Sequence, residues 1–365
     1  MKNSNRIIAG IFIIFLFLSL VVNIVLPDNL YSESEKRELD QMPDFTLDTV
    51  ISGDFTSKFD KYASDQFFGR DTWVFAKGLS QYLIGQKKLN GVYITEDRYI
   101  RELVVNKERL ENNLDAILKL AEKSGKPVTL LVVPEASTIY EDNLPLGETS
   151  KENHVIDRVY EKLGGKINIV YPKDILQENK DEYIYFNGDH HWTMKGAYYA
   201  YSQMTGTDKA YNFITVADDF KGTMVTKAGV KLPWIPHDKI EVPEEITNDY
   251  FAISVNRDGS DADGEMFYPE FLGEFDKYRY FQGGDQPLMA IGSVGKGTSF
   301  VLKDSFANVM LPYLALDNEV TYVADTRYNR QSPSEYAKTM NVDEIILIYS
   351  PDSLCNEFSL VNLGN

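Results

Sequence analysis

The chain has 365 residues, of which 43% are hydrophobic and 13% are aromatic. This length and composition are enough for one large core, and they exclude a minimal binding module and extensive disorder. With 37 Lys and Arg against 55 Asp and Glu, the formal net charge is −18, so nucleic acids are not expected partners. The one cysteine, Cys355, excludes an intramolecular disulfide and a cysteine zinc site.

An uncharged apolar stretch at residues 7–26, preceded by Lys2 and Arg6, predicts a transmembrane anchor over residues 1–27. Because the basic residues precede the stretch and mixed, acidic sequence follows, we expect the N-terminus in the cytoplasm and the catalytic body outside the cell membrane. A cleaved signal peptide is the alternative, but the apolar core is long and no good small-x-small cleavage site precedes Pro27.

Residues 28–53 are largely polar and predict a juxtamembrane linker, so that the catalytic domain spans residues 54–365. Early in this domain, aromatic residues recur at helical spacing and suggest two helices around residues 68–71.

The rest of the chain alternates helical patterns with short apolar runs, which predicts an α/β fold with a doubly wound parallel sheet. Residues 205–290 interrupt the alternation and read as an insertion or lid of irregular or β structure. The predicted helices cover 107–123, 197–204 with Thr193 as cap, 306–316 and 333–340, and the predicted strands cover 128–133, 167–171, 299–302, 319–323 and 344–349.

The chemistry is expected at the segment 187–196, which places two of the four histidines beside an aspartate in a strand-to-helix loop. Asp189 and His191 are two residues apart, so in extended backbone they project to the same side, and the carboxylate can fix the tautomer of the imidazole. His190 faces the other way and is expected to support the loop.

Ser305 is the candidate nucleophile, because a buried apolar run ends there and a helical pattern begins. A serine at the carboxyl end of a strand can use its own backbone N–H to stabilise an oxyanion. With Asp189 and His191 it would form a Ser-His-Asp triad in the chain order Asp, His, Ser.

Alternatives remain at each position. Ser305 could simply cap its helix, and the histidines could be structural. A metal site would need His154 or His237 as well, and adjacent histidines rarely turn to one ion, so neither a metal nor another cofactor is expected. Asp304 is a rival orienting acid, but adjacent side chains diverge.

The Asp-His-His-Trp-Thr segment at 189–193 and the Lys-Asp-Ser-Phe-Ala-Asn segment at 303–308 resemble the DHHW family, which is related to alginate O-acetyltransferase proteins with an SGNH-hydrolase-like domain. The segments at 67–71, 133–137 and 325–328 resemble it too. The resemblance implies an SGNH-like sheet with a permuted order, Asp-x-His before Ser. It also implies catalytic roles for Asp189, His191 and Ser305, and makes Arg327, Tyr328 and His190 candidates for contacting substrate or the oxyanion.

The resemblance further implies O-acetylation of a secreted or cell-surface polysaccharide, with acetyl groups received from a multispanning membrane acyltransferase. A carbohydrate acetylesterase and a non-catalytic glycan-binding subunit of a polysaccharide modification or export complex are the alternatives. The acidic charge suits a neutral or amino-sugar polymer better than a polyanion.

Overall fold

The computed structural model describes residues 2–32, 37–257, 259–328 and 331–365. The chain divides into two compact units: Met1–Gln86 with Thr226–Lys231, and Lys87–Val225 with Leu232–Asn365. Residues 54–86, which the sequence predicted within the catalytic domain, therefore fall in the first unit. All candidate catalytic residues lie in the second.

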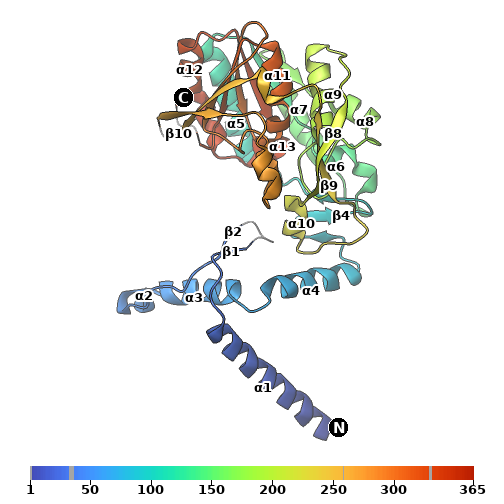
Figure 1. The fold of residues 1–365 in the computed structure, drawn as a ribbon, viewed down its shortest axis with the longest axis vertical. Helices are drawn as coiled ribbons and strands as arrows, with labels where there is room; N and C mark the ends of the chain where they lie inside the picture. The colour runs from blue at the N-terminus through green and yellow to red at the C-terminus, as the bar shows by residue number, and fades with distance from the viewer. Residues whose placement is uncertain (1, 33–36, 258, 329–330) are drawn as a thin grey trace. The chain divides into compact units, whose positions relative to one another are not determined.

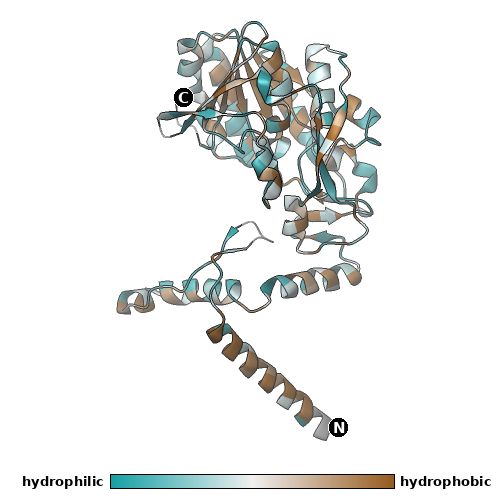
Figure 2. Cartoon of the chain, in the orientation of Figure 1, coloured by the Kyte–Doolittle hydropathy of each residue, from teal (hydrophilic) through white to brown (hydrophobic). Residues whose placement is uncertain are grey.

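Helix α1 (Lys2–Val25) is the apolar helix of the first unit. Its segment Arg6–Val25 has a mean hydropathy of 2.9, so by length and composition it can cross a membrane, as can a signal sequence. Figure 2 shows the hydrophobic colour along most of its length.

The remaining elements of the first unit are short and held by polar contacts. Arg37 donates to both carboxylate oxygens of Asp65, at 2.7 and 2.5 Å. The hydrogen bonds from Arg37 lower the pKa of Asp65 to about 2, because their effect is larger than that of burial, which would raise it. The elements are α2 (Leu47–Ser52), α3 (Asp54–Asp65), α4 (Arg70–Leu83), β1 (Tyr31–Ser32) and β2 (Arg37–Glu38). Two helices flanking residues 66–69 agree with the sequence prediction.

The second unit is built on an eight-stranded sheet with the order β11-β10-β12-β14-β13-β15-β6-β7. Figure 1 shows β10 and several of the helices of this unit. The five strands from β14 to β7 are parallel, as predicted from the alternation of strands with helices. Their bounds are β6 (Val128–Val132), β7 (Asn168–Val170), β13 (Thr298–Lys303), β14 (Val320–Asp325) and β15 (Glu344–Tyr349).

The other three strands correct the prediction of a wholly parallel sheet. β10 (Ala252–Arg257) pairs antiparallel with both β11 (Ser260–Gly264) and β12 (Leu288–Gly292), and β12 pairs antiparallel with β14. For β10 and β11 the physical reason is their closeness in the chain, since β10 ends at Arg257 and β11 begins at Ser260, and a parallel pair needs a crossover of a dozen or more residues. The predicted insertion at 205–290 thus extends the central sheet and makes it mixed.

Helices cover both faces of the parallel strands. On one face, Val301 and Val323 pack with Ala197 of α9 and Leu314 of α11. The side chains that point to the opposite face of the same strands pack with α5, α7, α12 and α13. The helices that lie wholly in the second unit are α5 (Lys107–Ser124), α6 (Ala136–Ile139), α7 (Glu152–Leu163), α8 (Lys173–Glu178), α9 (Met194–Thr205), α11 (Leu311–Asp317), α12 (Pro333–Thr339) and α13 (Pro351–Asn356). The chain passes from the second unit to the first within α10 (Thr223–Ala228).

Smaller elements complete the described chain. A three-stranded sheet contains β3 (Lys88–Leu89), β4 (Val92–Ile94) and β5 (Tyr99–Arg101), and a separate ribbon contains β8 (Phe213–Phe220) and β9 (Asp238–Pro243). The 3₁₀ helices are η1 (Glu141–Asn143), η2 (Asn248–Tyr250), η3 (Pro269–Gly273), η4 (Lys277–Tyr280), η5 (Ser305–Val309) and η6 (Ser359–Gly364).

Local signals near the site behave largely as the sequence predicts. Thr193 caps α9, with its hydroxyl accepting from the Gly196 N–H at 3.3 Å. The helix expected over 306–316 is instead split into η5 and α11. Pro312 lies in the first turn of α11, where its missing N–H costs nothing, so the chain restarts a helix there.

Candidate active site

Asp189, His191 and Ser305 form a continuous hydrogen-bonded chain. His191 Nδ1 lies 2.6 Å from Asp189 Oδ1, and His191 Nε2 lies 2.8 Å from Ser305 Oγ. Asp189 and His191 are almost fully buried, at 2% and 5% exposure. With the carboxylate accepting at Nδ1, the imidazole is held in the tautomer whose Nε2 can accept the serine proton.

The loop that carries Asp189 is held by a buried acid from β9. Asp238 accepts from the backbone N–H groups of Asn187 at 2.5 Å and Gly188 at 2.7 Å, and from the Tyr183 hydroxyl at 2.9 Å. Gly222 packs so closely on Gly188 that a Cβ there would stand 2.1 Å from the Gly188 carbonyl carbon. The loop is therefore fixed on two sides before any ligand binds.

Thr223 holds the second oxygen of the Asp189 carboxylate. Its backbone N–H and its hydroxyl donate to Asp189 Oδ2 at 2.7 and 2.8 Å. Burial alone would raise the pKa of Asp189, but the electrostatic interaction with the neighbouring imidazoles of His190 and His191 and the hydrogen bonds from His191 and Thr223 hold that pKa well below its ordinary value. Asp189 thus stays a carboxylate across the physiological pH range.

An aromatic ring fixes the plane of the His191 imidazole. Tyr278 of η4 stacks on it with ring centroids 4.3 Å apart and planes 12° from parallel. The Tyr278 hydroxyl also donates to the Ser305 carbonyl at 3.0 Å, so one side chain contacts both the base and the nucleophile's backbone. Sequence analysis missed Tyr278 because it lies in the predicted insertion, among many other aromatic residues.

Ser305 is the first residue of η5, and only Asp304 separates it from the end of β13. The N–H groups of a first helical turn have no intrahelical partner. Asp304, not Ser305, caps that helix, with Oδ1 accepting from the Phe306 N–H at 3.0 Å. The other Asp304 oxygen accepts from the Ser350 N–H and the Ser353 hydroxyl. Asp304 is therefore engaged in holding the loop, whereas the imidazole of His191 pairs with Asp189.

A polar pocket of about 200 Å³ opens beside Ser305. Its lining includes His190 and two cationic side chains. Arg101 comes from β5, and Arg327 comes from the loop after β14. A larger hollow lies on the antiparallel part of the central sheet, and the described residues of its lining do not include a triad residue. The 200 Å³ pocket is the candidate active site because Ser305 itself lines it.

Arg327 is held at this pocket by buried carboxylates. Its guanidinium donates to Asp325 at 2.9 and 2.5 Å and to Asp285 at 2.8 Å. Asp285 also accepts from Lys303, whose ammonium is fully buried, at 2.8 Å. Although burial opposes it, the charges of Lys303 and Arg327 lower the pKa of Asp285. A rigid ionic network therefore aims one cation at the pocket.

Arg101 is a second cation that sequence analysis did not single out. It donates to both oxygens of Glu135, at 2.8 and 3.0 Å, and lies 3.1 Å from Asp352. Glu135, whose role the sequence left open, is 2% exposed and acts as the partner of this arginine. Arg101 forms part of the pocket wall and is held there by Glu135 and Asp352. Its distance along the chain from Ser305 explains why no motif connects the two residues.

Of the two remaining candidates for contacting substrate, His190 lines the pocket and Tyr328 does not. His190 lines the pocket, and its Nδ1 lies 3.0 Å from the Thr223 hydroxyl, in keeping with support of the loop. Tyr328 is 54% exposed and is not among the described residues that line the pocket.

A metal ion is the other chemistry that this cluster could serve. Ligand atoms of Asp189, His190 and His191 lie within 4.8 Å of one another. Both ring nitrogens of His191 are already engaged, one by Asp189 and one by Ser305. A metal would have to displace one of these bonds, so the geometry favours nucleophilic catalysis.

A buried acid behind the Arg101 wall gives a testable pH dependence. Glu152 accepts from the Glu135 N–H, the Thr138 hydroxyl and the Tyr171 hydroxyl. Burial, with the nearby charge of Glu135, raises the pKa of Glu152 from an ordinary value of 4.5 to about 8. The unfolded chain therefore loses this proton first, and the free energy of unfolding should fall as the pH rises from 4.5 to about 8.

Glu152→Gln should remove this part of the pH dependence and stabilise the protein at pH 8 by about 1 kcal/mol or more, since each unit of pKa difference is worth about 1.4 kcal/mol. Urea unfolding of the full chain in detergent near the two ends of that pH range measures the effect, with the exposed Glu161→Gln as control. Equal pH slopes in parent and Glu152→Gln would contradict the assignment.

Comparison with known proteins agrees with this architecture. The family model described as DHHW protein matches residues 106–324. A DHHW family protein from Eubacterium siraeum DSM 15702 is 23% identical, with a TM-score of 0.63 over 76% of this chain and 96% of that chain. Bacillus cereus PatB1, solved with a sulfonyl adduct, is 16% identical, with a TM-score of 0.63 over 75% of this chain and 98% of that one.

The O-acetyltransferase domain of Pseudomonas putida AlgJ is 13% identical, with a TM-score of 0.44 over 75% of this chain and 99% of that one. None of the curated proteins compared matches the chain. The first two structures share the mixed α/β fold with its large central sheet.

Proposed function

Because the chain belongs to the DHHW family, we propose that it is a membrane-anchored O-acetyltransferase that modifies a secreted or cell-surface polysaccharide through an acetyl-serine intermediate. The observation that carries the proposal is the hydrogen-bonded chain from Asp189 through His191 to Ser305. A serine in such a chain is an activated nucleophile for acyl transfer. The choice of acetyl rests on the resemblance of the motifs to O-acetyltransferase relatives.

In the first half of the reaction, Ser305 Oγ attacks the carbonyl carbon of the acetyl donor while His191 Nε2 takes the hydroxyl proton. Asp189 stabilises the imidazolium that forms. The Ser305 backbone N–H and the Arg327 guanidinium are the proposed donors to the oxyanion. Collapse of this intermediate expels the donor's oxygen, which receives the proton from His191, and leaves acetyl on Ser305.

In the second half, a sugar hydroxyl attacks the acetyl-serine. His191 takes the hydroxyl proton and returns it to Ser305 Oγ as the ester bond to the serine breaks. The acetyl group ends on the sugar oxygen and the enzyme is restored. Water in place of the sugar would complete an esterase cycle with the same residues.

The apolar helix α1 supports the proposed location. With Lys2 and Arg6 on its N-terminal side, we infer a single-pass anchor with the N-terminus in the cytoplasm and the catalytic unit outside. Acetyl groups must then reach the outside of the membrane, and a multispanning membrane acyltransferase is the proposed donor partner.

A transfer assay separates the transferase from its alternatives. The full chain in detergent is given a chromogenic acetyl ester and a neutral oligosaccharide, and the sugar is examined by mass spectrometry. We expect acetylated oligosaccharide from the parent and none from Ser305→Ala. Ester consumption without sugar acetylation would identify an acetylesterase. Absence of both, with oligosaccharide binding unchanged in Ser305→Ala, would favour a binding subunit.

A further inference from the structure

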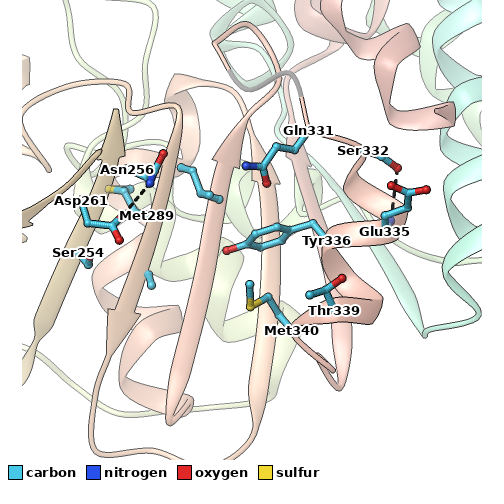
Figure 3. Close-up of a pocket in the computed structure, with 12 residues that line it drawn as sticks. Ser254, Asn256, Asp261, Met289, Gln331, Ser332, Glu335, Tyr336, Thr339 and Met340 are labelled. Carbon is cyan, nitrogen blue, oxygen red and sulfur yellow. Dashed lines mark hydrogen bonds between the residues drawn. The ribbon is translucent and has the colours of Figure 1, made fainter. Parts of the chain in front are cut away.

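A groove of about 630 Å³ runs along the antiparallel part of the central sheet, and the mechanism does not use it. Its walls come from β10, β11 and β12 on one side and from α12 on the other (Figure 3). The sheet groove, as we name it, has the volume of a small-molecule or oligomer site.

Strand alternation explains why the groove exists. Ile253, Val255 and Ile291 point into the core. The side chains between them, including Ser254 and Ala290, point to the opposite face, where they are only half-buried. On the parallel strands that face is covered by α5, α12 and α13, but beyond α12 it is left open and forms the groove floor.

The groove offers an aromatic platform with polar groups around it. Tyr336 projects from α12 over the groove (Figure 3), and its ring packs against Phe300 at 5.0 Å and Tyr322 at 5.7 Å, which fixes its orientation. Asn256 donates to Asp261 at 2.6 Å through its amide nitrogen, so its amide oxygen can accept from a ligand hydroxyl. A fixed ring with flanking acceptors suits a sugar ring and its hydroxyls.

The charge of the groove selects among glycans. Two carboxylates, Asp261 and Glu335, belong to the lining, and the described lining residues include no lysine, arginine or histidine. Placing a uronate or phosphate there would set like charges side by side without a compensating cation. The groove therefore fits a chain without acidic groups.

The register of the sheet connects the groove to the catalytic edge. Leu288, in the groove lining, pairs with Ala324, and Ala324 pairs with Leu302, three residues before Ser305. The groove therefore begins at the same sheet edge from which Ser305 projects. The chain gives a second link, since Arg327 lines the catalytic pocket and Gln331, four residues later, lines the groove.

We propose that the sheet groove binds a stretch of a non-acidic glycan chain and so presents its hydroxyls to the acetyl-serine on Ser305. This inference rests on the proposed function and deepens it by naming the acceptor class and its subsite. Glycan units held in the groove would raise the local concentration of acceptor hydroxyls over water.

The test separates glycan binding from ester chemistry. Binding of hexa-N-acetylchitohexaose, and of an anionic hexameric polyuronate, is measured by calorimetry on the full chain carrying Ser305→Ala. Ala290→Trp, which fills the groove floor, and Glu335→Ala, on an exposed helix position, are compared with Lys338→Ala, which lies on α12 outside the lining. Chromogenic acetyl ester turnover is measured with the same groove substitutions in the active protein.

We expect the neutral hexamer to bind more tightly than the polyuronate, and Ala290→Trp to weaken that binding about tenfold or more, with a smaller loss for Glu335→Ala and none for Lys338→Ala. Ester turnover should persist in all three. Neutral-glycan affinity unchanged in both groove variants, or a preference for the polyuronate, would overturn the inference even if ester turnover is intact. Lack of ester turnover in the parent would instead count against the proposed function.

Discussion

Ser305→Ala should reduce turnover of a chromogenic acetyl ester by at least about 10⁴-fold, since loss of the nucleophile leaves only binding and oxyanion stabilisation. Its Oγ is the atom within 2.8 Å of His191 Nε2, and no alanine atom can replace it. The measurement is kcat/KM on the full chain in detergent, with unfolding followed in parallel to show that the variant is folded.

Ser353→Ala is the matched control for this substitution. Ser353 lines the same pocket, but its hydroxyl donates to Asp304 and not to the base. The Ser350 N–H still holds that Asp304 oxygen in the variant, so turnover should change by less than about tenfold. Similar losses in both variants would mean that Ser305 acts only through the structure of the pocket.

Asp189→Asn is expected to lower kcat by about 10⁴-fold while KM changes little. An amide can donate to His191 Nδ1, which would select the tautomer with the proton on Nε2 and leave it unable to accept from Ser305. The Thr223 N–H and hydroxyl, which donate to the Asp189 carboxylate, would then face either the amide NH₂ group or the amide oxygen, which is a poorer acceptor than a carboxylate oxygen. Steady-state kinetics on the chromogenic ester measure the loss.

The exposed acid Asp181 provides the comparison, because Asp181→Asn removes one carboxylate outside the candidate site and should leave kcat unchanged. If Asp189→Asn kept more than about a tenth of the parent kcat, the carboxylate would not be orienting the base, and the role of Asp189 would be to hold the loop.

Short-range patterns were enough to predict the parallel strands and the residues of the hydrogen-bonded chain. The run 128–133 is continuously apolar because β6 is buried on both faces. The two-residue spacing of Asp189 and His191 is also a local property, and it predicts their shared side. Ser305 could be placed because the end of a buried strand is visible in the sequence.

Long-range pairing could not be predicted in the same way. The antiparallel strands of the insertion are only half-buried, so their apolar signal is weak. β12 pairs with β10, which ends at Arg257, and with β14, which begins at Val320, and nothing local in the sequence relates these segments. Tyr278, Thr223 and Arg101 reach the site only through tertiary folding. Their positions in the chain carry no spacing that relates them to Ser305.

Intact-mass analysis of the full chain after brief exposure to a chromogenic acetyl ester tests the central claim most directly. The account predicts one acetyl adduct that peptide mapping places on Ser305, with no adduct in Ser305→Ala and strongly reduced formation in His191→Ala. Folded parent protein that forms no adduct and consumes no ester, or an adduct that persists in Ser305→Ala, would contradict it.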